Sequence, residues 1–595
     1  MTAGLLVAAG TTALGIAIIV LVTGGFTIAA GAFHLSAHRI LPPVIAALAA
    51  YASAAALDRS RLRTVLEAVC PRIDRHAFAI AIVLAAAMAG IGVAFGTYSA
   101  SAADAAGYIS QADLLAHGRT AFTEPLIRRA TWPEAGWTFA PLGYRPGRQA
   151  DELVPTYPPG LPLVMVAAST VAGDAGPFLV APLFGALCVL ATYVLGARVH
   201  GRIAGLVAAA FLTTSPIWLF QIVQPMSDVP AAALWTLGFL AATSGAGVLA
   251  GLASSAAILM RPNLFLLTAS VLVLLLWSAR ESSPQSGLRA RIRPLVVCAI
   301  AASIGPLVIA VQQWRLYGNP LLSGHGTLRE LFAIGNIPEN VRDYAVRLLL
   351  GETPAIVVSL VALASLLIPR RTVSEVPRLS TALRVLVVVL VPLLISYLPY
   401  GVFPDWSYLR FLMPALPAAF IVCGAVVTNA SARIPAPLRG SVLVLTLVAC
   451  CATDVVIARR QAAFDMRRYE SRYRTAGRYL AAVLPRDAVI VTSQESASAH
   501  YYTRLPIVRW DFLPNLDEAV STLIAAGRHP VLLIEDWEEP ALRARFPRST
   551  LALLDWNARA LFGTTTRVRF LDPADREDAP APRSQSVLRT QDRLP

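Results

Sequence analysis

Long apolar runs recur along most of this chain, and they constrain its fold more than any other feature of the sequence. About thirteen runs approach or reach the roughly 20 residues that an α-helix needs to cross a bilayer. The expected spans are 5–33, 41–57, 77–98, 176–197, 204–222, 230–244, 246–260, 263–279, 295–314, 354–369, 383–400, 411–428 and 441–457. Charged residues make up 14% of the chain, against about 25% in a typical soluble domain. The sequence therefore predicts a polytopic α-helical membrane protein.

Arginine carries the topology signal, because the sequence contains no lysine. Arginine clusters fall in alternate loops between the expected spans, at 58–76, 198–202, 280–294, 370–384 and 433–439. Loops rich in basic residues stay on the cytoplasmic side of a membrane. We therefore expect a multi-pass protein of the cell inner (cytoplasmic) membrane, with a cytoplasmic N-terminus and a periplasmic C-terminal region. These loops account for the net charge of +14, so no nucleic-acid partner is predicted.

The expected spans divide the chain into unequal parts. Residues 1–76 are expected to form a two-helix membrane extension, and residues 77–457 the membrane core with its large outer loop at 99–175. After the last span the charge rises, and short apolar runs alternate with amphipathic segments. Such alternation predicts a small soluble α/β domain over 458–571, which we expect to be accessory to the core. The composition of the tail, 572–595, predicts disorder.

Two aspartates stand beside expected spans on the outer side. Asp104 follows a span at the start of the large loop, where a carboxylate can act as general base for an acceptor hydroxyl. Capping of a helix over 105–117 is the alternative. Asp228 lies between Pro225 and Pro230 in an outer turn, and helix capping is again the alternative. Two acids on one face suit glycosyl chemistry or a divalent metal, and the sequence leaves both open.

Two arginines break the rule that basic residues stay inside. Arg261 lies in an outer turn between two spans, and Arg410 lies at the outer mouth of the next-to-last span. An arginine at this depth can hold a phosphate headgroup with its fork of donors, and snorkelling at the interface is the alternative. His325, between two glycines of an outer loop, is interpreted as structural. The sequence has no phosphate-binding loop and no zinc-protease or serine-hydrolase motif.

Taken together, these elements resemble the GT-C superfamily of membrane glycosyltransferases. Within it they are similar to the bacterial relatives of protein O-mannosyltransferases and of the lipid A aminoarabinose transferase. The matching residues are Asp104 with Tyr108, Tyr157-Pro158-Pro159-Gly160, Ser227-Asp228-Val229-Pro230, Tyr317-Gly318-Asn319-Pro320 with Ser323-Gly324, and Arg410-Phe411-Leu412-Met413-Pro414. The chain departs from the family pattern in two ways, because two extra spans precede the core and Asp104 lacks the acidic neighbour of the protein mannosyltransferases.

The resemblance implies a periplasmic active site and a hexose or pentose donor linked to polyprenyl phosphate. The residues it implies are Asp104 (base or orienter) and Asp228 as catalytic acids, Arg261 and Arg410 on the donor phosphate, and Tyr108 and Tyr157 in support. It implies no certain cofactor, with a divalent metal left open. The implied partners are membrane lipid, the lipid-linked sugar, and a glycan, lipid or protein acceptor.

Two other readings compete with a transferase. A transporter or a flippase for lipid-linked sugars is one, and a catalytically inactive relative is the other. Transporters usually place their ionisable groups near the membrane midplane. Here the acids and the outer arginines cluster at one face beneath a large loop, and this placement favours an enzyme.

Overall fold

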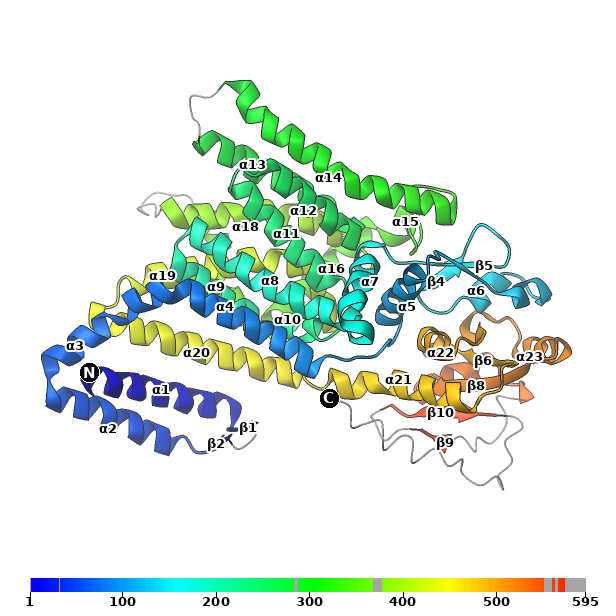
Figure 1. The fold of residues 1–595 in the computed structure, drawn as a ribbon, viewed down its shortest axis with the longest axis horizontal. Coiled ribbons are helices and arrows are strands. Elements are labelled where there is room, and N and C mark those ends of the chain that lie inside the picture. Colours follow the sequence, from blue (N-terminus) through cyan, green and yellow to red (C-terminus); the bar gives the residue numbers. More distant parts are fainter. Residues whose placement is uncertain are drawn as a thin grey trace.

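The computed structural model describes residues 2–30, 33–282, 287–367, 377–550, 559–561 and 566–572. Figure 1 shows a bundle of helices with the large loop and the C-terminal sheet side by side at one end. Among the described residues, eight helical segments are long and apolar enough to cross a membrane. The count is nine if the bent pair α9 (Arg202–Thr214) and α10 (Pro216–Ile222) is one span. The chain is therefore a multi-pass membrane protein.

Each expected span overlaps a helix of the structure, but four of these helices are short. They have 10–17 residues: α2 (Leu41–Leu57), α11 (Asp228–Thr243), α12 (Gly247–Met260) and α17 (Ala355–Ala364). The other spans correspond to the bent pair and to α1 (Thr2–Thr23), α4 (Val69–Phe95), α8 (Gly176–Val199), α13 (Leu267–Ser282), α14 (Leu288–Tyr317), α18 (Pro377–Tyr397), α19 (Leu416–Ser431) and α20 (Ala436–Arg460). An apolar run shows that a helix is buried or in lipid, and it does not show that the helix crosses the whole bilayer.

The first expected span, 5–33, extends too far at its C-terminal end. α1 stops at Thr23, and Gly24 and Gly25 follow with φ of 77° and 120°, a region that glycine enters without steric cost. The chain then forms an antiparallel hairpin of β1 (Phe26–Ala30) and β2 (Phe33–Ala37). Composition could not place this boundary, because the β-branched and aromatic residues of the hairpin are as apolar as the helix before it.

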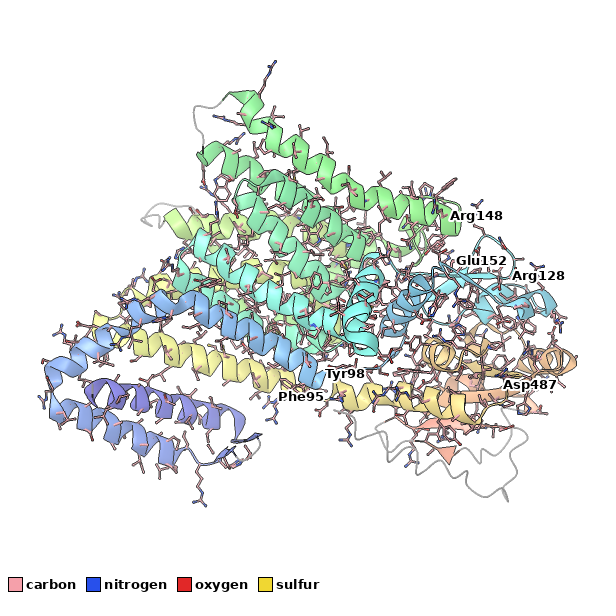
Figure 2. All side chains as sticks on the ribbon, in the orientation of Figure 1. Phe95, Tyr98, Arg128, Arg148, Glu152 and Asp487 are labelled. Atoms are coloured by element: carbon pink, nitrogen blue, oxygen red, sulfur yellow. The ribbon has the colours of Figure 1, made fainter. Side chains whose placement is uncertain are left out.

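The large loop is a folded structure that begins where the chain leaves α4. Figure 2 labels Phe95 and Tyr98 at this exit, and Arg128, Arg148 and Glu152 on the loop itself. The loop contains α5 (Asp104–Ala116), α6 (Ala135–Phe139) and an antiparallel sheet in the order β3 (Phe122–Thr123), β5 (Glu152–Pro155), β4 (Tyr144–Pro146). It returns to the bundle through α7 (Gly160–Ala172). A second connecting segment, after α14, contains α15 (Leu328–Leu331) and α16 (Ile337–Gly351).

The C-terminal region combines helices with a five-stranded sheet in the order β7-β6-β8-β10-β9. Its strands are β6 (Ala488–Thr492), β7 (Ile507–Arg509), β8 (His529–Glu535), β9 (Arg559–Ala560) and β10 (Val568–Leu571). Its helices are α21 (Met466–Val483), α22 (Ser496–Thr503), α23 (Leu516–Ala525) and α24 (Glu539–Arg545). β6 pairs in parallel with β7 and β8, whereas β10 is antiparallel to β8. The predicted disordered tail lies, apart from Asp572, outside the described residues.

The C-terminal region and the large loop share one hydrophobic core. Leu126, Trp132 and Phe139 of the loop are buried in the same cluster as Val489 and Trp510 of the C-terminal region. Polar contacts across this boundary include Thr131 to Glu518 at 2.8 Å, and Arg504 to Asp113 at 2.8 Å. One of the apolar clusters of the C-terminal region is therefore completed by residues of the large loop. We call the two parts together the outer body.

Candidate active site

The candidate site lies where the large loop meets the ends of the membrane helices. Asp104 is the first residue of α5, Tyr108 follows one turn later, and Tyr157 stands shortly before α7. A Cβ atom at Gly107 would lie 2.1 Å from Cε2 of Tyr157, so only glycine lets the tyrosine ring lie against α5. The rings of Tyr108 and Tyr157 are 4.4 Å apart between centroids. The loop thereby brings Tyr157 to Asp104, which lies 53 positions earlier in the chain, and to Tyr108 beside it.

Both carboxylate oxygens of Asp104 accept hydrogen bonds. The Tyr157 hydroxyl donates to Oδ1 at 2.7 Å, and Nη2 of Arg410 donates to Oδ2 at 3.1 Å. Burial raises the pKa of Asp104, but the charge of Arg410 and the bond from Tyr157 outweigh it and hold the pKa below its usual value. Asp104 is therefore ionised at neutral pH and is a weak base. About a third of its side chain, 35%, is exposed.

Asp228 forms a second ion pair, with Arg261. Asp228 begins α11, and Arg261 ends α12, so two helix termini bring the residues together. The side chain of Asp228 is 1% exposed, and a carboxylate so deeply buried requires its cationic partner. The Tyr108 hydroxyl hydrogen-bonds Ser227 Oγ at 2.9 Å, which joins this pair to α5.

Both arginines lie close to one aromatic ring, that of Phe411. The guanidinium carbons of Arg261 and Arg410 are 5.3 Å and 5.6 Å from the centroid of Phe411. Arg410 belongs to η6 (Trp406–Ala415), the 3-10 helix that precedes α19. Its Nε atom is buried and has no hydrogen-bond partner among the described residues. With five donors on each guanidinium, both arginines have capacity beyond their aspartates, while the two acids balance their charge.

The structure brings all six residues selected from the sequence into one cluster. Asp104 and Arg410 meet across 306 residues of chain. Sequence reasoning missed Ser227 as the partner of Tyr108, and Phe411 as the ring that both arginines approach. It interpreted His325 as structural, and the structure places its ring edge-on against Tyr157 with centroids 5.4 Å apart. Its place between two glycines in an outer loop was the only available signal.

A divalent metal was left open by the sequence, and the residues present do not fit one. Among the residues that the structure describes, no group of three or more His, Cys, Asp or Glu side chains is arranged to hold a metal ion. Ca²⁺ and Mg²⁺ are bound through several oxygen ligands. Here Asp104 and Asp228 both face arginines, which take the place that a cation would need.

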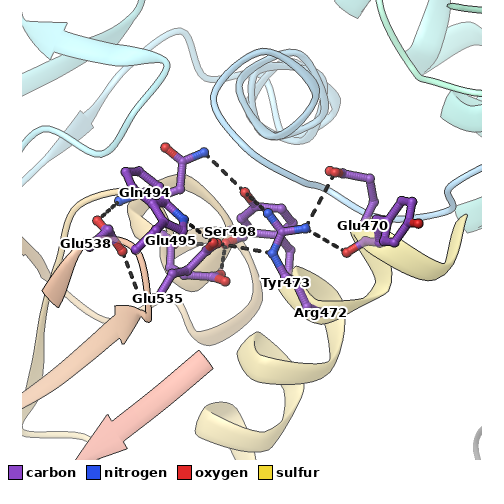
Figure 3. Close-up of polar contacts among 10 residues, drawn as sticks. Glu470, Arg472, Tyr473, Gln494, Glu495, Ser498, Glu535 and Glu538 are labelled. Atoms are coloured by element: carbon purple, nitrogen blue, oxygen red, sulfur yellow. Dashed lines mark hydrogen bonds and ion pairs between the residues drawn. The ribbon is translucent and has the colours of Figure 1, made fainter. Parts of the chain in front are cut away.

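A second polar network lies in the outer body, where β6 and β8 end (Figure 3). Glu495, Glu535 and Glu538 are buried there, and Nε of Arg472 donates to Glu535 at 3.2 Å. Burial raises the pKa of Glu538 to about 7 and that of Glu495 well above its usual value. When some of these carboxylates are protonated, the single positive charge of Arg472 can balance the negative charge that remains. The network attaches α21 to the sheet, and nothing in the sequence predicted it.

Comparison with known proteins gives similarity in structure but not in sequence. No family profile matches the chain, and no curated protein sequence matches it. ArnT from Cupriavidus metallidurans bound to undecaprenyl phosphate is 12% identical, with a TM-score of 0.47 over 82% of this chain and 97% of that chain. AglB, the oligosaccharyltransferase from Archaeoglobus fulgidus in complex with an inhibitory peptide and a dolichol-phosphate, is 12% identical, with a TM-score of 0.47 over 80% and 72%.

Both proteins are members of the GT-C superfamily, which the motifs of this chain resemble. Identities of 12% and TM-scores of 0.47 do not transfer a substrate or a residue role to this chain. Its function therefore has to be argued from its own residues.

Proposed function

We propose that this protein is a membrane glycosyltransferase that moves a sugar from a polyprenyl-phosphate donor to an acceptor on the outer face of the cytoplasmic membrane. The observation that supports this proposal most strongly is two neighbouring ion pairs beneath the outer body, Asp104–Arg410 and Asp228–Arg261. Arg261 and Arg410 lie at the ends of membrane helices, at the depth expected for the phosphate of a membrane lipid. The acceptor, which is a glycan, a lipid or a protein, approaches from the side of the outer body.

The charge changes of sugar transfer match this arrangement. The phosphate of the donor is a diester with one negative charge, and it gains a second charge as the bond from phosphate oxygen to C1 breaks. Arg261 and Arg410 stabilise the developing charge with donors that are already oriented. Asp104 holds Arg410 and Tyr157 in position, and its ionised carboxylate stabilises the positive charge that develops on the sugar ring. Asp228 fixes Arg261, and Tyr108 links the two ion pairs.

The choice of donor is the direct test of this proposal. Purified protein is supplied with radiolabelled undecaprenyl-phosphate hexoses and pentoses, or with the matching nucleotide sugars, in the presence of native cell envelope as acceptor. We expect sugar release and transfer from at least one lipid-linked donor, and none from the nucleotide sugars. Transfer from a nucleotide sugar alone, in a detergent preparation free of lipid carrier, would contradict the proposal.

The outer face of the site is tested by the topology of the chain. In a variant without its six cysteines, single cysteines are placed at Arg128 on the large loop and at Arg63 in α3 (Arg59–Glu67), the helix before α4. Their side chains are 66% and 73% exposed, so both positions are open to reagents. We expect an impermeant thiol reagent to label position 128 in intact cells, and position 63 only after lysis. The reverse pattern would place the site in the cytoplasm.

One observation favours the alternative of a transporter. Glu352 and Asp454 are buried at the bend between α9 and α10, where the Ile217 N–H donates to Glu352 at 3.4 Å and the Thr214 hydroxyl to Asp454 at 3.0 Å. Buried acids in a broken helix are typical of ion-coupled transport. A transporter would move the lipid-linked sugar across vesicles without releasing it from its phosphate. Release of the sugar from its lipid phosphate by the purified protein therefore distinguishes a transferase from a transporter.

A further inference from the structure

His325 lies at the tip of a tight turn that is fixed to the loop segment carrying Tyr157. Ser323 and Gly326 form a backbone β-bridge, in which the Gly326 N–H donates to the Ser323 carbonyl at 3.2 Å, and the Ser323 hydroxyl also donates to the Gly326 carbonyl at 2.7 Å. Nη1 of Arg145 donates to the Ser323 carbonyl at 3.0 Å. A Cβ atom at Gly324 would lie 2.0 Å from the carbonyl oxygen of Thr156, so the turn packs directly on the backbone beside Tyr157. The position of His325 is therefore set by contacts on both sides of the turn.

The imidazole of His325 has a different environment from the carboxylate of Asp104. Its ring packs edge-on against Tyr157, whose hydroxyl donates to Asp104, so the two groups flank one tyrosine. His325 is exposed, and its ring makes no hydrogen bond to the side chains that the structure describes. Asp104 has both oxygens engaged. The site thus contains one weak base that is already bonded and one imidazole that is open to an incoming group.

We propose that His325 is the general base that removes the proton from the acceptor hydroxyl, a role that rests on the proposed transferase function. One imidazole nitrogen takes the proton as the acceptor oxygen bonds to C1 of the sugar. The bond from C1 to the phosphate oxygen breaks, and its electron pair leaves with the polyprenyl phosphate. The imidazolium later returns its proton to water. In this assignment Asp104 orients and stabilises, and it does not take the proton.

Desolvation by the surrounding protein favours the neutral imidazole of His325 at pH 7. The surrounding protein lowers the pKa of His325, Asp104 raises it, and Arg261 and Arg145 lower it, with a net pKa below the usual value. In the same turn, Glu330 accepts a hydrogen bond from the backbone of Thr327 at 2.6 Å. A neutral imidazole can accept a proton, and an imidazolium cannot. Turnover by this route therefore falls as the pH drops through the pKa of His325.

The pH dependence of kcat/KM tests this assignment with the lipid-linked donor that the wild-type protein uses. His325→Gln should lower kcat at neutral pH by about 10²–10⁴-fold, the usual contribution of a general base. In the wild type, kcat/KM should fall as the pH drops below about 6.5, and this acidic limb of the pH profile should disappear in the variant. Protonation of Asp104 also lowers the rate, but it does so at a lower pH, because the pKa of Asp104 is held below its usual value. The two effects can therefore be distinguished in the pH profile.

His117→Gln is the matched control, since His117 is an exposed histidine at the end of α5 with Nδ1 2.7 Å from the Asp113 carbonyl oxygen. It should keep both the rate and the acidic limb. Added imidazole should restore part of the turnover of His325→Ala, which a purely structural role would not allow. An unchanged limb in His325→Gln, or a kcat within twofold of wild type, overturns the assignment. If the wild-type protein releases no sugar from any lipid-linked donor, the proposed function itself fails.

Discussion

Replacing Asp104 with asparagine is expected to lower kcat by about 10²–10³-fold, the loss typical of one oriented electrostatic group in a transition state. The amide keeps the size of the side chain but removes the charge that balances Arg410 and accepts the bond from Tyr157. Folding should change little, because the side chain is 35% exposed. The measurement is turnover of the lipid-linked donor by purified protein, with gel filtration and thermal unfolding to compare the two proteins.

Asp113→Asn is the control for this change. Asp113 lies on the same helix and pairs with Arg504 at 2.8 Å, outside the tyrosine–arginine cluster. Loss of its charge should leave kcat close to the wild-type value. If Asp104→Asn also keeps a near wild-type kcat, then Asp104 acts only at the start of α5, as a helix-capping residue does.

Removal of Arg410 is expected to lower kcat/KM by about 10- to 150-fold. A hydrogen bond to a charged group contributes about 1.5–3 kcal/mol, which corresponds to this range. Part of the loss should be in kcat, because the phosphate gains negative charge as the sugar leaves. Arg410→Lys should recover only part of the activity, since an ammonium cannot make two parallel hydrogen bonds to a phosphate. Steady-state kinetics of the alanine and lysine variants separate these effects.

Arg128→Ala controls for the loss of an outer arginine. Its side chain is 66% exposed and pairs with Asp151 on the far side of the large loop. It should leave both kinetic constants close to wild type. If Arg410→Ala raises KM alone and leaves kcat unchanged, Arg410 binds the donor in the ground state and gives no extra stabilisation to the transition state.

The sequence predicted the membrane helices because their signal is local. A window of about 20 residues is enough to detect an apolar run, and the placement of arginines in the neighbouring loops predicts which way the span is oriented in the membrane. Local signals do not set every helix end: the expected span 246–260 matches the short α12, but the end of α1 at Thr23 was not predicted. The residues that follow Thr23 are apolar in a strand as well as in a helix.

Much of the candidate site was predicted through the order of short motifs and not through geometry. Asp104, Tyr157 and Arg410 belong to such motifs, and the structure joins them by hydrogen bonds. Phe411 belongs to the same motif as Arg410, but no role was assigned to it, and His325 had no comparable signal, since a histidine in a loop is common. Their positions depend on packing between segments far apart in the chain, for which one sequence contains no periodic pattern.

The core of the outer body has a consequence for how the protein is made. Phe139 and Val489 belong to one apolar cluster, and residues 139 and 489 are about 350 positions apart in the chain. At roughly 5–20 residues per second, the loop leaves the ribosome about 20–70 s before the strand that covers it. During that interval Leu126, Trp132 and Phe139 lack their final partners and can bind other apolar surfaces. We therefore expect these side chains to stay exposed until β6 has been made, and a product truncated before β6 to keep this apolar surface exposed.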